Sequence, residues 1–160
     1  MQKMILVDYS KCSGCRYCET ACSARHEGVC NPYRSRIKVM RSDMEGFVAP
    51  MLCQQCIDAP CARVCPVGAL SRDNNGLGLV RLDYDLCIGC KMCMVACPFG
   101  AMKFDERKMR VIKCDFCDGD PACVKACSTD ALLFVDATEA DAQKRSEIAE
   151  DYSEVEKRFA

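Results

Sequence analysis

The residues with the clearest chemistry are seventeen cysteines in a chain of 160 residues. Sixteen of them fall into four runs of four, at residues 12–22, 53–65, 87–97 and 114–127. In the third run Cys87, Cys90 and Cys93 share one tight loop. Cys97 follows about one helical turn later and precedes Pro98. Such a C-x2-C-x2-C-x3-C-P run is the ligand pattern of a cubane [4Fe–4S] cluster.

The four runs are variations on one pattern. The first and third carry a glycine before their second cysteine, Gly14 and Gly89, which lets the backbone approach a cluster and point amides at sulfur. The second and fourth have extra residues before their third cysteine, among them Pro60 and Pro121, which predicts a defined turn. The alternation of the two types indicates a duplicated unit of two runs.

Zinc is the alternative metal, because four thiolates suit its tetrahedral geometry. Zinc motifs, however, usually consist of two separated cysteine pairs, whereas three cysteines in one short loop favour a cluster with several corners. Sixteen cysteines therefore predict four [4Fe–4S] clusters. Cys30 is left over and is expected to be a small buried residue. The single histidine, His26, is expected at the surface or at a helix cap rather than on a metal.

The fourth cysteine of each run is expected to serve the cluster of a partner run, as in two-cluster ferredoxins. The partners could be sequential, one with two and three with four, or nested, two with three and one with four. Runs two and three both end Cys-Pro, whereas runs one and four both end Cys-Ser, which favours nesting. Nesting predicts four ligand sets: Cys12, Cys15 and Cys18 with Cys127; Cys114, Cys117 and Cys123 with Cys22; Cys53, Cys56 and Cys61 with Cys97; Cys87, Cys90 and Cys93 with Cys65.

The elements that must position these cysteines are short. Apolar or alternating stretches predict strands at residues 4–9, 36–40, 47–51, 77–82, 109–112 and 131–135. Asn75-Gly76 indicates a hairpin turn, and residues 26–35 read as a polar link. The first and last strands are natural partners, which again favours nesting. The expected fold is α+β, with nested bacterial-ferredoxin-like modules of short strands and short helices around four clusters.

These elements divide the chain into three predicted parts. They are an outer module of residues 1–52 and 110–137, an inner module of residues 53–109, and a charged C-terminal helix of residues 138–160. The helix carries one narrow apolar stripe, formed by Ile148, Tyr152, Val155 and Phe159. It could fold back on its own domain or dock on a partner. Sequence alone leaves both alternatives open.

Composition and charge exclude several function classes. The first apolar run, residues 4–7, is shorter than a signal-peptide core, and no run reaches the roughly 18 residues of a membrane span. A cytoplasmic, reducing compartment is therefore expected, where clustered cysteines bind metal rather than form disulfides. The formal charge of −1 becomes about −9 with four clusters, which disfavours nucleic acid. No phosphate loop, nucleotide fingerprint or nucleophile–histidine–acid set indicates a catalytic site.

Three segments resemble a known family. They are Cys-Ser-Gly-Cys-Arg-Tyr-Cys at 12–18, Gln-Cys-Ile-Asp-Ala-Pro-Cys at 55–61 and Lys-Cys-Asp-Phe-Cys at 113–117. With the order of the four runs, they resemble the four-cluster electron-transfer subunits of the dimethyl sulfoxide reductase and formate dehydrogenase iron–sulfur family, over about residues 4–135. The resemblance implies ferredoxin-like modules, nested ligation and a catalytic partner. Small members serve tungsten aldehyde oxidoreductases, carbon monoxide dehydrogenases or hydrogenases.

The predicted function is single-electron transfer between a catalytic oxidoreductase subunit and a further redox partner. A molybdenum or tungsten enzyme of anaerobic metabolism, such as an aldehyde oxidoreductase, is the favoured partner. A free soluble polyferredoxin is the alternative, and an iron–sulfur sensor is a third. Four cations near the ligands, Arg16, Lys91, Lys113 and Lys125, are expected to be solvated.

Overall fold

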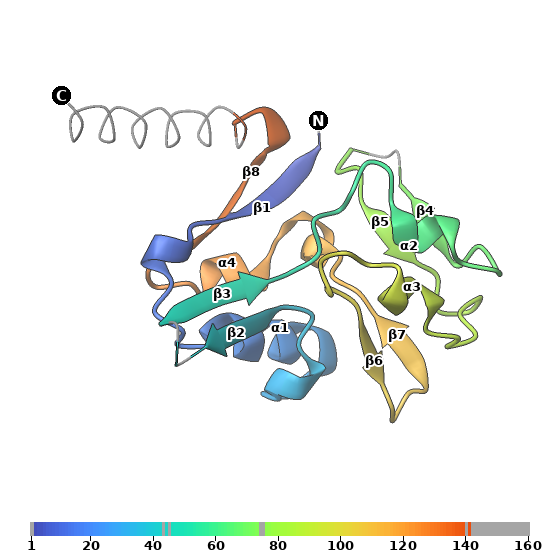
Figure 1. Cartoon of the computed structure of the whole chain (residues 1–160), viewed down its shortest axis with the longest axis horizontal. Coiled ribbons are helices and arrows are strands. Elements are labelled where there is room, and N and C mark those ends of the chain that lie inside the picture. Colours follow the sequence, from blue (N-terminus) through green and yellow to red (C-terminus); the bar gives the residue numbers. More distant parts are fainter. Residues whose placement is uncertain (1, 43, 45, 74–75, 140, 142–160) are drawn as a thin grey trace.

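The computed structural model describes residues 2–42, 44, 46–73, 76–139 and 141 (Figure 1). Its strands are β1 (Lys3–Val7), β2 (Lys38–Ser42), β3 (Phe47–Met51), β4 (Leu70–Arg72), β5 (Val80–Leu82), β6 (Lys103–Asp105), β7 (Arg110–Ile112) and β8 (Leu132–Asp136). Its helices are α1 (Tyr17–Glu27), α2 (Pro60–Arg63), α3 (Met92–Val95) and α4 (Ala122–Lys125), with 3-10 turns η1 (Tyr9–Lys11), η2 (Pro32–Arg34) and η3 (Phe116–Gly119). This mixture of short strands and helices agrees with the expected α+β class.

The strands of the described residues form four antiparallel pairs. Three are formed by strands that follow one another along the chain, β2 with β3, β4 with β5 and β6 with β7. The fourth joins the first strand to the last, with Lys3 opposite Asp136 and Val7 opposite Leu132. An ion pair of 3.0 Å between Lys3 and Asp136 closes the end of this pair. The expected pairing of the terminal strands is therefore confirmed.

Two buried cores divide the described chain into two halves, which we name for their places in the sequence. The outer half contains β1, α1, β2, β3, α4 and β8, and its core includes Ile5, Ile37 and Leu132. The inner half contains α2, β4, β5, α3, β6 and β7, and its core includes Val80 and Val111. Figure 1 shows β4–β7 gathered on one side, away from β1 and β8. Both cores also contain cysteines, so the predicted ligands lie inside the packed interior.

The longest described helix, α1, was not predicted. Its buried residues are Cys18, Glu19, Cys22 and Ser23, so no run of aliphatic residues marks its inner face. The helix begins after Arg16 and ends at Gly28, and both of these residues have left-handed backbone conformations. Part of the stretch expected to be a polar link therefore continues α1. Because the buried positions hold cysteine, glutamate and serine rather than aliphatic residues, hydrophobic periodicity does not indicate this helix.

Nearly all of the helix expected over residues 138–160 lies outside the described residues, including its apolar stripe. Among the residues that are described, no helix has both the length and the hydropathy needed to cross a bilayer.

Gly89 shows how closely one ligand loop approaches its neighbour. Its φ is +68°, and an added Cβ would lie 2.6 Å from the Met109 carbonyl oxygen. Gly100 has a similar φ of +56°, but no atom of the described chain lies within 4 Å of where its Cβ would be. Alanine at position 100 would therefore add only the cost of a left-handed backbone, whereas alanine at position 89 would add a steric clash as well.

We expect Gly89→Ala to lower the thermal midpoint and the iron content of the protein more than Gly100→Ala does. Both changes add the cost of a left-handed L-residue, about 1–2 kcal/mol. Only Gly89→Ala also forces the loop of Cys87 and Cys90 away from β7. Thermal unfolding and iron analysis of the two variants measure the difference, and equal losses would contradict the role of the close approach.

Candidate metal centres

Three of the cavities in the described chain are each lined by four cysteines. We number the cysteine groups by the run that supplies three members. Group 1 is Cys12, Cys15, Cys18 and Cys127, group 2 is Cys53, Cys56, Cys61 and Cys97, and group 3 is Cys87, Cys90, Cys93 and Cys65. In each case a cysteine from another run completes the cavity lining. The structure thus brings together the cysteines that the nested scheme assigns to these sets.

The remaining four cysteines, group 4, are Cys22, Cys114, Cys117 and Cys123. Helices α1 and α4 pack against each other in the outer half. Burial, together with the neighbouring thiols of Cys22 and Cys117, raises the pKa of the Cys123 thiol to about 12. Cys22 and Cys123 contribute in the same way to the raised pKa of Cys114. Cys22, Cys114 and Cys123 also lie in one buried core cluster, which agrees with these mutual effects.

One backbone conformation recurs in all four runs. The residue two positions after the first cysteine has a positive φ: +72° at Gly14, +49° at Gln55, +68° at Gly89 and +53° at Phe116. Glycine adopts this conformation without strain, whereas Gln55 and Phe116 do so at a cost. Both non-glycine residues are almost completely buried. Their packing and hydrogen bonds therefore hold the loop in the shape that glycine supplies elsewhere.

Backbone amides point at several of the sulfurs. The Ala69 amide donates to Cys65 Sγ at 3.3 Å, and the Arg36 amide donates to Cys22 Sγ at 3.3 Å. Burial alone would raise the pKa of Cys65, but amide donors of residues 67–70 outweigh it and the pKa is lowered. The pKa of Cys127 is lowered in the same way, because the Thr129 side chain and the amides of Thr129, Ala131 and Leu132 outweigh burial. Such donors stabilise sulfur as a thiolate.

Burial has the opposite effect at the cysteines in the interior. It raises the pKa of Cys18 to about 12 and that of Cys93 to about 11. Several thiolates could be held together there only if positive charge lay among them. Iron supplies that charge and binds thiolate sulfur directly. The donor chemistry, all sulfur with amides behind it, therefore fits iron–sulfur clusters.

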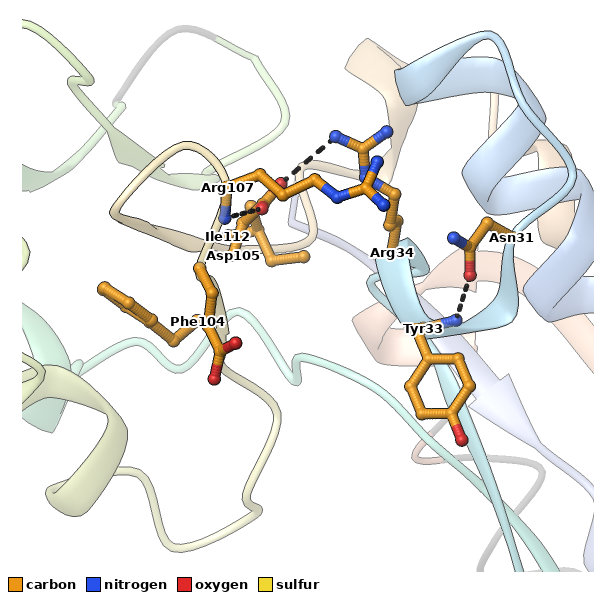
Figure 2. A pocket seen from close by; sticks show the side chains of 8 residues that line it. Asn31, Tyr33, Arg34, Phe104, Asp105, Arg107 and Ile112 are labelled. Carbon is orange, nitrogen blue, oxygen red and sulfur yellow. Dashed lines mark hydrogen bonds and ion pairs between the residues drawn. The ribbon is translucent and has the colours of Figure 1, made fainter.

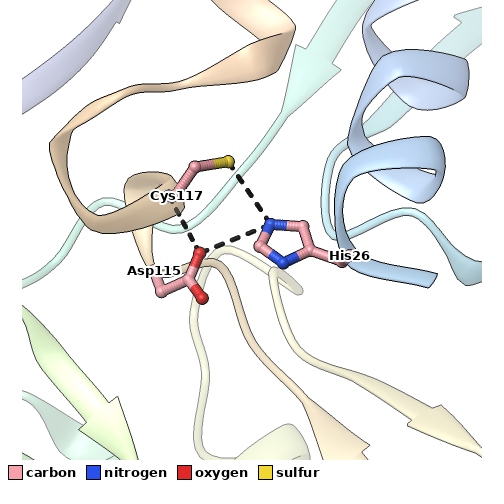
Figure 3. Close-up of side chains that lie close together, drawn as sticks. All are labelled: His26, Asp115 and Cys117. Atoms are coloured by element: carbon pink, nitrogen blue, oxygen red, sulfur yellow. Dashed lines mark hydrogen bonds and ion pairs between the residues drawn. The ribbon is translucent and has the colours of Figure 1, made fainter. Parts of the chain in front are cut away.

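His26, Asp115 and Cys117 form a contact that sequence reasoning missed (Figure 3). His26 Nε2 lies 3.3 Å from Cys117 Sγ and 3.5 Å from Asp115 Oδ1. Arg36 Nη1 donates to Asp115 Oδ2 at 2.6 Å. The three ligand-type atoms lie within 4.8 Å of one another, but Cys117 is already a member of group 4. Because His26 lies far from Asp115 and Cys117 in the sequence, no local pattern indicates this contact.

The expectation that His26 lies at the surface or at a cap is wrong. Its side chain is 13% exposed and faces Cys117, because α1 packs its last turn against the fourth run. Burial, followed by the charge of Arg36, lowers the pKa of His26, so the ring is neutral at pH 7. Burial alone would raise the pKa of Asp115, but Arg36 outweighs it and keeps the carboxylate ionised. A neutral ring with its proton on Nε2 can donate to Cys117 sulfur.

Arg16, expected to be solvated, is paired with a completely buried carboxylate. Its Nη2 lies 2.7 Å from Glu19 Oε2. The other oxygen of Glu19 accepts a hydrogen bond of 2.7 Å from the Val39 amide. Glu19 thereby fixes the start of α1, and with it Cys18, against β2. The sequence pattern gave no indication of a buried acid here.

Among the grouped cysteines, the exposed ones belong to groups 1 and 3. Cys15 of group 1 and Cys90 of group 3 are exposed, whereas all four members of group 4 are buried or half-buried. Cys30 is also exposed, which corrects the expectation of a buried residue. It follows the end of α1 and lines none of the three cysteine cavities.

A wider hollow lies between η2 and the hairpin of β6 and β7 (Figure 2). Its volume is about 450 Å³, and Tyr33, Arg34, Asp105 and Arg107 are among its lining residues. Arg34 Nη2 lies 3.5 Å from Asp105 Oδ2 across it. None of its eight lining residues is a cysteine or histidine. The hollow therefore adds no sulfur or imidazole ligand.

Comparison with known proteins agrees with this chemistry. Residues 44–137 match the family model described as the 4Fe-4S dicluster domain. The chain is 38% identical to the electron transport protein HydN of Escherichia coli, over 93% of this chain and 98% of HydN. It is 43% identical to the polyferredoxin-like subunit of aliphatic sulfonate oxidoreductase of Pyrococcus furiosus, over 82% of this chain and 76% of that subunit.

A solved structure is also similar. A chain of the active site complex BamBC of benzoyl coenzyme A reductase aligns with a TM-score of 0.50 and 29% identity. The alignment covers 92% of this chain and 89% of that chain.

Cys15 and Cys30 provide a matched test of the cavity assignment, because both are exposed cysteines. We expect Cys15→Ser to reduce the iron bound per chain by up to one cluster, and Cys30→Ser to leave it unchanged. Only the first change removes a sulfur from a four-cysteine cavity. Iron and acid-labile sulfide analysis of the anaerobically purified variants measures the effect. Equal iron loss in the two variants would contradict the assignment.

Proposed function

The chain belongs to the 4Fe-4S dicluster family of electron-transport proteins, and from this premise we propose that it relays single electrons through four [4Fe–4S] clusters. The observation that carries the proposal is the convergence of sixteen cysteines into four groups of four. Each [4Fe–4S] cluster accepts or gives up one electron with little rearrangement. The protein's own part is to hold the four sulfurs, supply amide donors and keep water from the interior. Groups 1 to 4 are the proposed ligand sets.

The nested scheme is the proposed division into modules. Residues 1–52 with 110–137 would form the outer module, and residues 53–109 the inner one. The strand pairs and the two cores support this division. The scheme is the one implied by the resemblance to the iron–sulfur subunits of the dimethyl sulfoxide reductase and formate dehydrogenase type.

Neighbouring groups define a proposed order of transfer, 3–2–4–1. In addition to burial, Cys61 of group 2 raises the pKa of Cys93 of group 3. Cys53 of group 2 acts likewise on Cys114 of group 4. Cys18 of group 1 acts on Cys123, also of group 4. Core packing supports this order: Cys18, Cys114 and Cys123 lie in one buried core, against which Cys53 packs, and Cys61 and Cys93 lie in the other.

The ends of this line are the proposed entry and exit points for electrons. Group 3 ends at the exposed Cys90 and group 1 at the exposed Cys15. Exposed apolar side chains lie close in sequence to both cysteines: Ile88, Met92 and Val95 to Cys90, and Tyr17 to Cys15. Such surfaces suit transient contact with redox partners.

The proposed partner at one end is a catalytic oxidoreductase subunit, with a molybdenum or tungsten enzyme favoured and a carbon monoxide dehydrogenase or hydrogenase as alternatives. Relatives named as subunits of an aliphatic sulfonate oxidoreductase and of formate hydrogenlyase support a redox enzyme partner. A further redox protein would occupy the other end, in the cytoplasm. The segment of residues 138–160, for which the sequence predicts a helix, is a candidate docking segment. A free polyferredoxin is the alternative function.

The ligand sets can be tested by counting lost clusters in paired variants. Cys65→Ala alone should cost one cluster. Under the nested scheme, adding Cys90→Ala removes no further cluster, because both residues belong to group 3. Adding Cys56→Ala removes a second, because it belongs to group 2. The readout is the iron content of each purified variant relative to wild type.

The competing schemes give different counts. If each run held its own cluster, the pair with Cys56→Ala would lose one cluster and the pair with Cys90→Ala two. Sequential sharing would cost two clusters in both pairs. Either pattern would overturn the nested ligand sets.

We expect the untagged protein, isolated without oxygen from its own cells, to elute with a larger subunit containing molybdenum or tungsten. The exposed apolar side chains at the two proposed ends of the relay favour contact with a partner. Size-exclusion chromatography with metal analysis measures this. A fully loaded monomer that exchanges electrons with several enzymes would support the polyferredoxin alternative instead.

A further inference from the structure

Lys113 is a buried cation in the middle of the proposed relay. It directly follows β7 and precedes Cys114 of group 4. Only 4% of the residue is exposed, so the expectation that it is solvated is wrong. Its Nζ donates to Gln55 Oε1 at 3.0 Å and to the Cys114 carbonyl oxygen at 3.1 Å. Both acceptors are neutral.

Within the described residues, no carboxylate forms an ion pair with Lys113, in contrast to Lys3, which pairs with Asp136 at 3.0 Å. A buried ammonium without an opposite charge is costly, and proteins rarely retain one without a partner or a function. Two neutral oxygens satisfy two of its three donors but none of its charge. The counter-charge must therefore come from another kind of group.

The cysteines of group 2 can supply this negative charge. Lys113 lines the same cavity as Cys53, Cys56, Cys61 and Cys97. Burial raises the pKa of Cys61, and the positive charge of Lys113 opposes that rise. Lys113 acts in the same direction on Cys56. The ammonium therefore already interacts with two sulfurs of group 2.

Gln55 fixes the ammonium in this place. It is completely buried, and it lies between Cys53 and Cys56 in the second run. Its Oε1 also accepts from the Val80 amide at 2.9 Å, and its Nε2 donates to the Cys114 carbonyl at 2.7 Å. The side chain is therefore held at both ends, and Lys113 is directed to the boundary between groups 2 and 4.

We propose that Lys113 is a positioning residue whose ammonium is the counter-charge of the cluster in group 2, and that it raises the reduction potential of that cluster above the value it would otherwise have. The inference rests on the proposed relay. Four thiolates around a core of about +2 leave a net negative site, and reduction adds one more negative charge. A nearby cation stabilises the reduced form more than the oxidised form. An electron arriving from a neighbouring group would then be held more strongly at group 2 than it would be without Lys113.

The test replaces Lys113 in the full-length protein and measures the potential of each cluster. Lys113→Gln keeps a hydrogen-bond donor without the charge, Lys113→Met keeps the approximate shape, and Lys113→Arg keeps the charge. Lys3→Met is the matched control, because it removes one positive charge that already has its own carboxylate. Iron content is determined first, and an electron paramagnetic resonance titration against ambient potential follows. Cys56→Ala identifies the signal of group 2.

We expect Lys113→Gln and Lys113→Met to shift one signal, that of group 2, to lower potential. At the wild-type midpoint the ratio of reduced to oxidised cluster should fall about tenfold, which corresponds to about 59 mV for one electron. Lys113→Arg and Lys3→Met should leave it within twofold. If the Gln and Met variants load iron fully and their signals are unchanged, the proposal is overturned.

If the Lys113→Gln and Lys113→Met variants do not fold, the iron content of the three variants still tests the proposal. Failure of Gln and Met with full loading of Arg would support a requirement for the charge. Failure of all three would indicate a packing role and overturn the proposal. A wild-type protein without [4Fe–4S] signals would instead overturn the proposed function, which keeps the two failures distinct.

Discussion

The requirement to keep sulfur anions inside a small protein governs the rest of this structure. The described strands are three to five residues long, and three of the four α-helices have four residues, so aliphatic packing alone forms only modest cores. Cysteines occupy much of both cores, and burial opposes their ionisation. Iron reverses that balance, because it converts buried thiols into bonded thiolates. Metal–sulfur bonds then contribute a large part of the folding free energy that hydrophobic burial supplies in other domains.

The protein meets this requirement with a limited set of polar groups. Amides point at sulfur from the backbone, as at Cys65 and Cys22. Side chains act at longer range, and each cation near a cysteine group has a different partner: Arg16 pairs with Glu19, Arg36 with Asp115, and Lys113 with neutral oxygens. The cysteine groups of one chain therefore lie in unequal electrostatic surroundings, although each consists of four cysteines. In the proposed relay, differences in reduction potential between the clusters would come from the polar residues behind the cysteines.

Much of this arrangement could be predicted from sequence, because cysteine spacing and terminal residues are local patterns. The spacing predicts three members of each group, and the Cys-Pro and Cys-Ser endings favour the nested fourth member that lines three of the cavities. Gly14 and Gly89 mark the left-handed positions of two loops. The same position in the other two runs holds Gln55 and Phe116, which no local rule identifies, because burial rather than intrinsic preference enforces their conformation. The contacts of His26 and Lys113 were likewise hidden, since each joins segments more than fifty residues apart.

The pairing of β1 with β8 has a consequence for how the protein matures. Groups 2 and 3 draw on one continuous stretch, residues 53–97, and can be completed while later residues are still being synthesised. Group 1 needs Cys127, and β1 has no partner strand until residue 136 has emerged. Non-local contacts of this kind form late. Under the proposed ligand sets, assembly would proceed from the middle of the chain outward, and the thiols of group 1 would stay open to attack by oxygen until its last step.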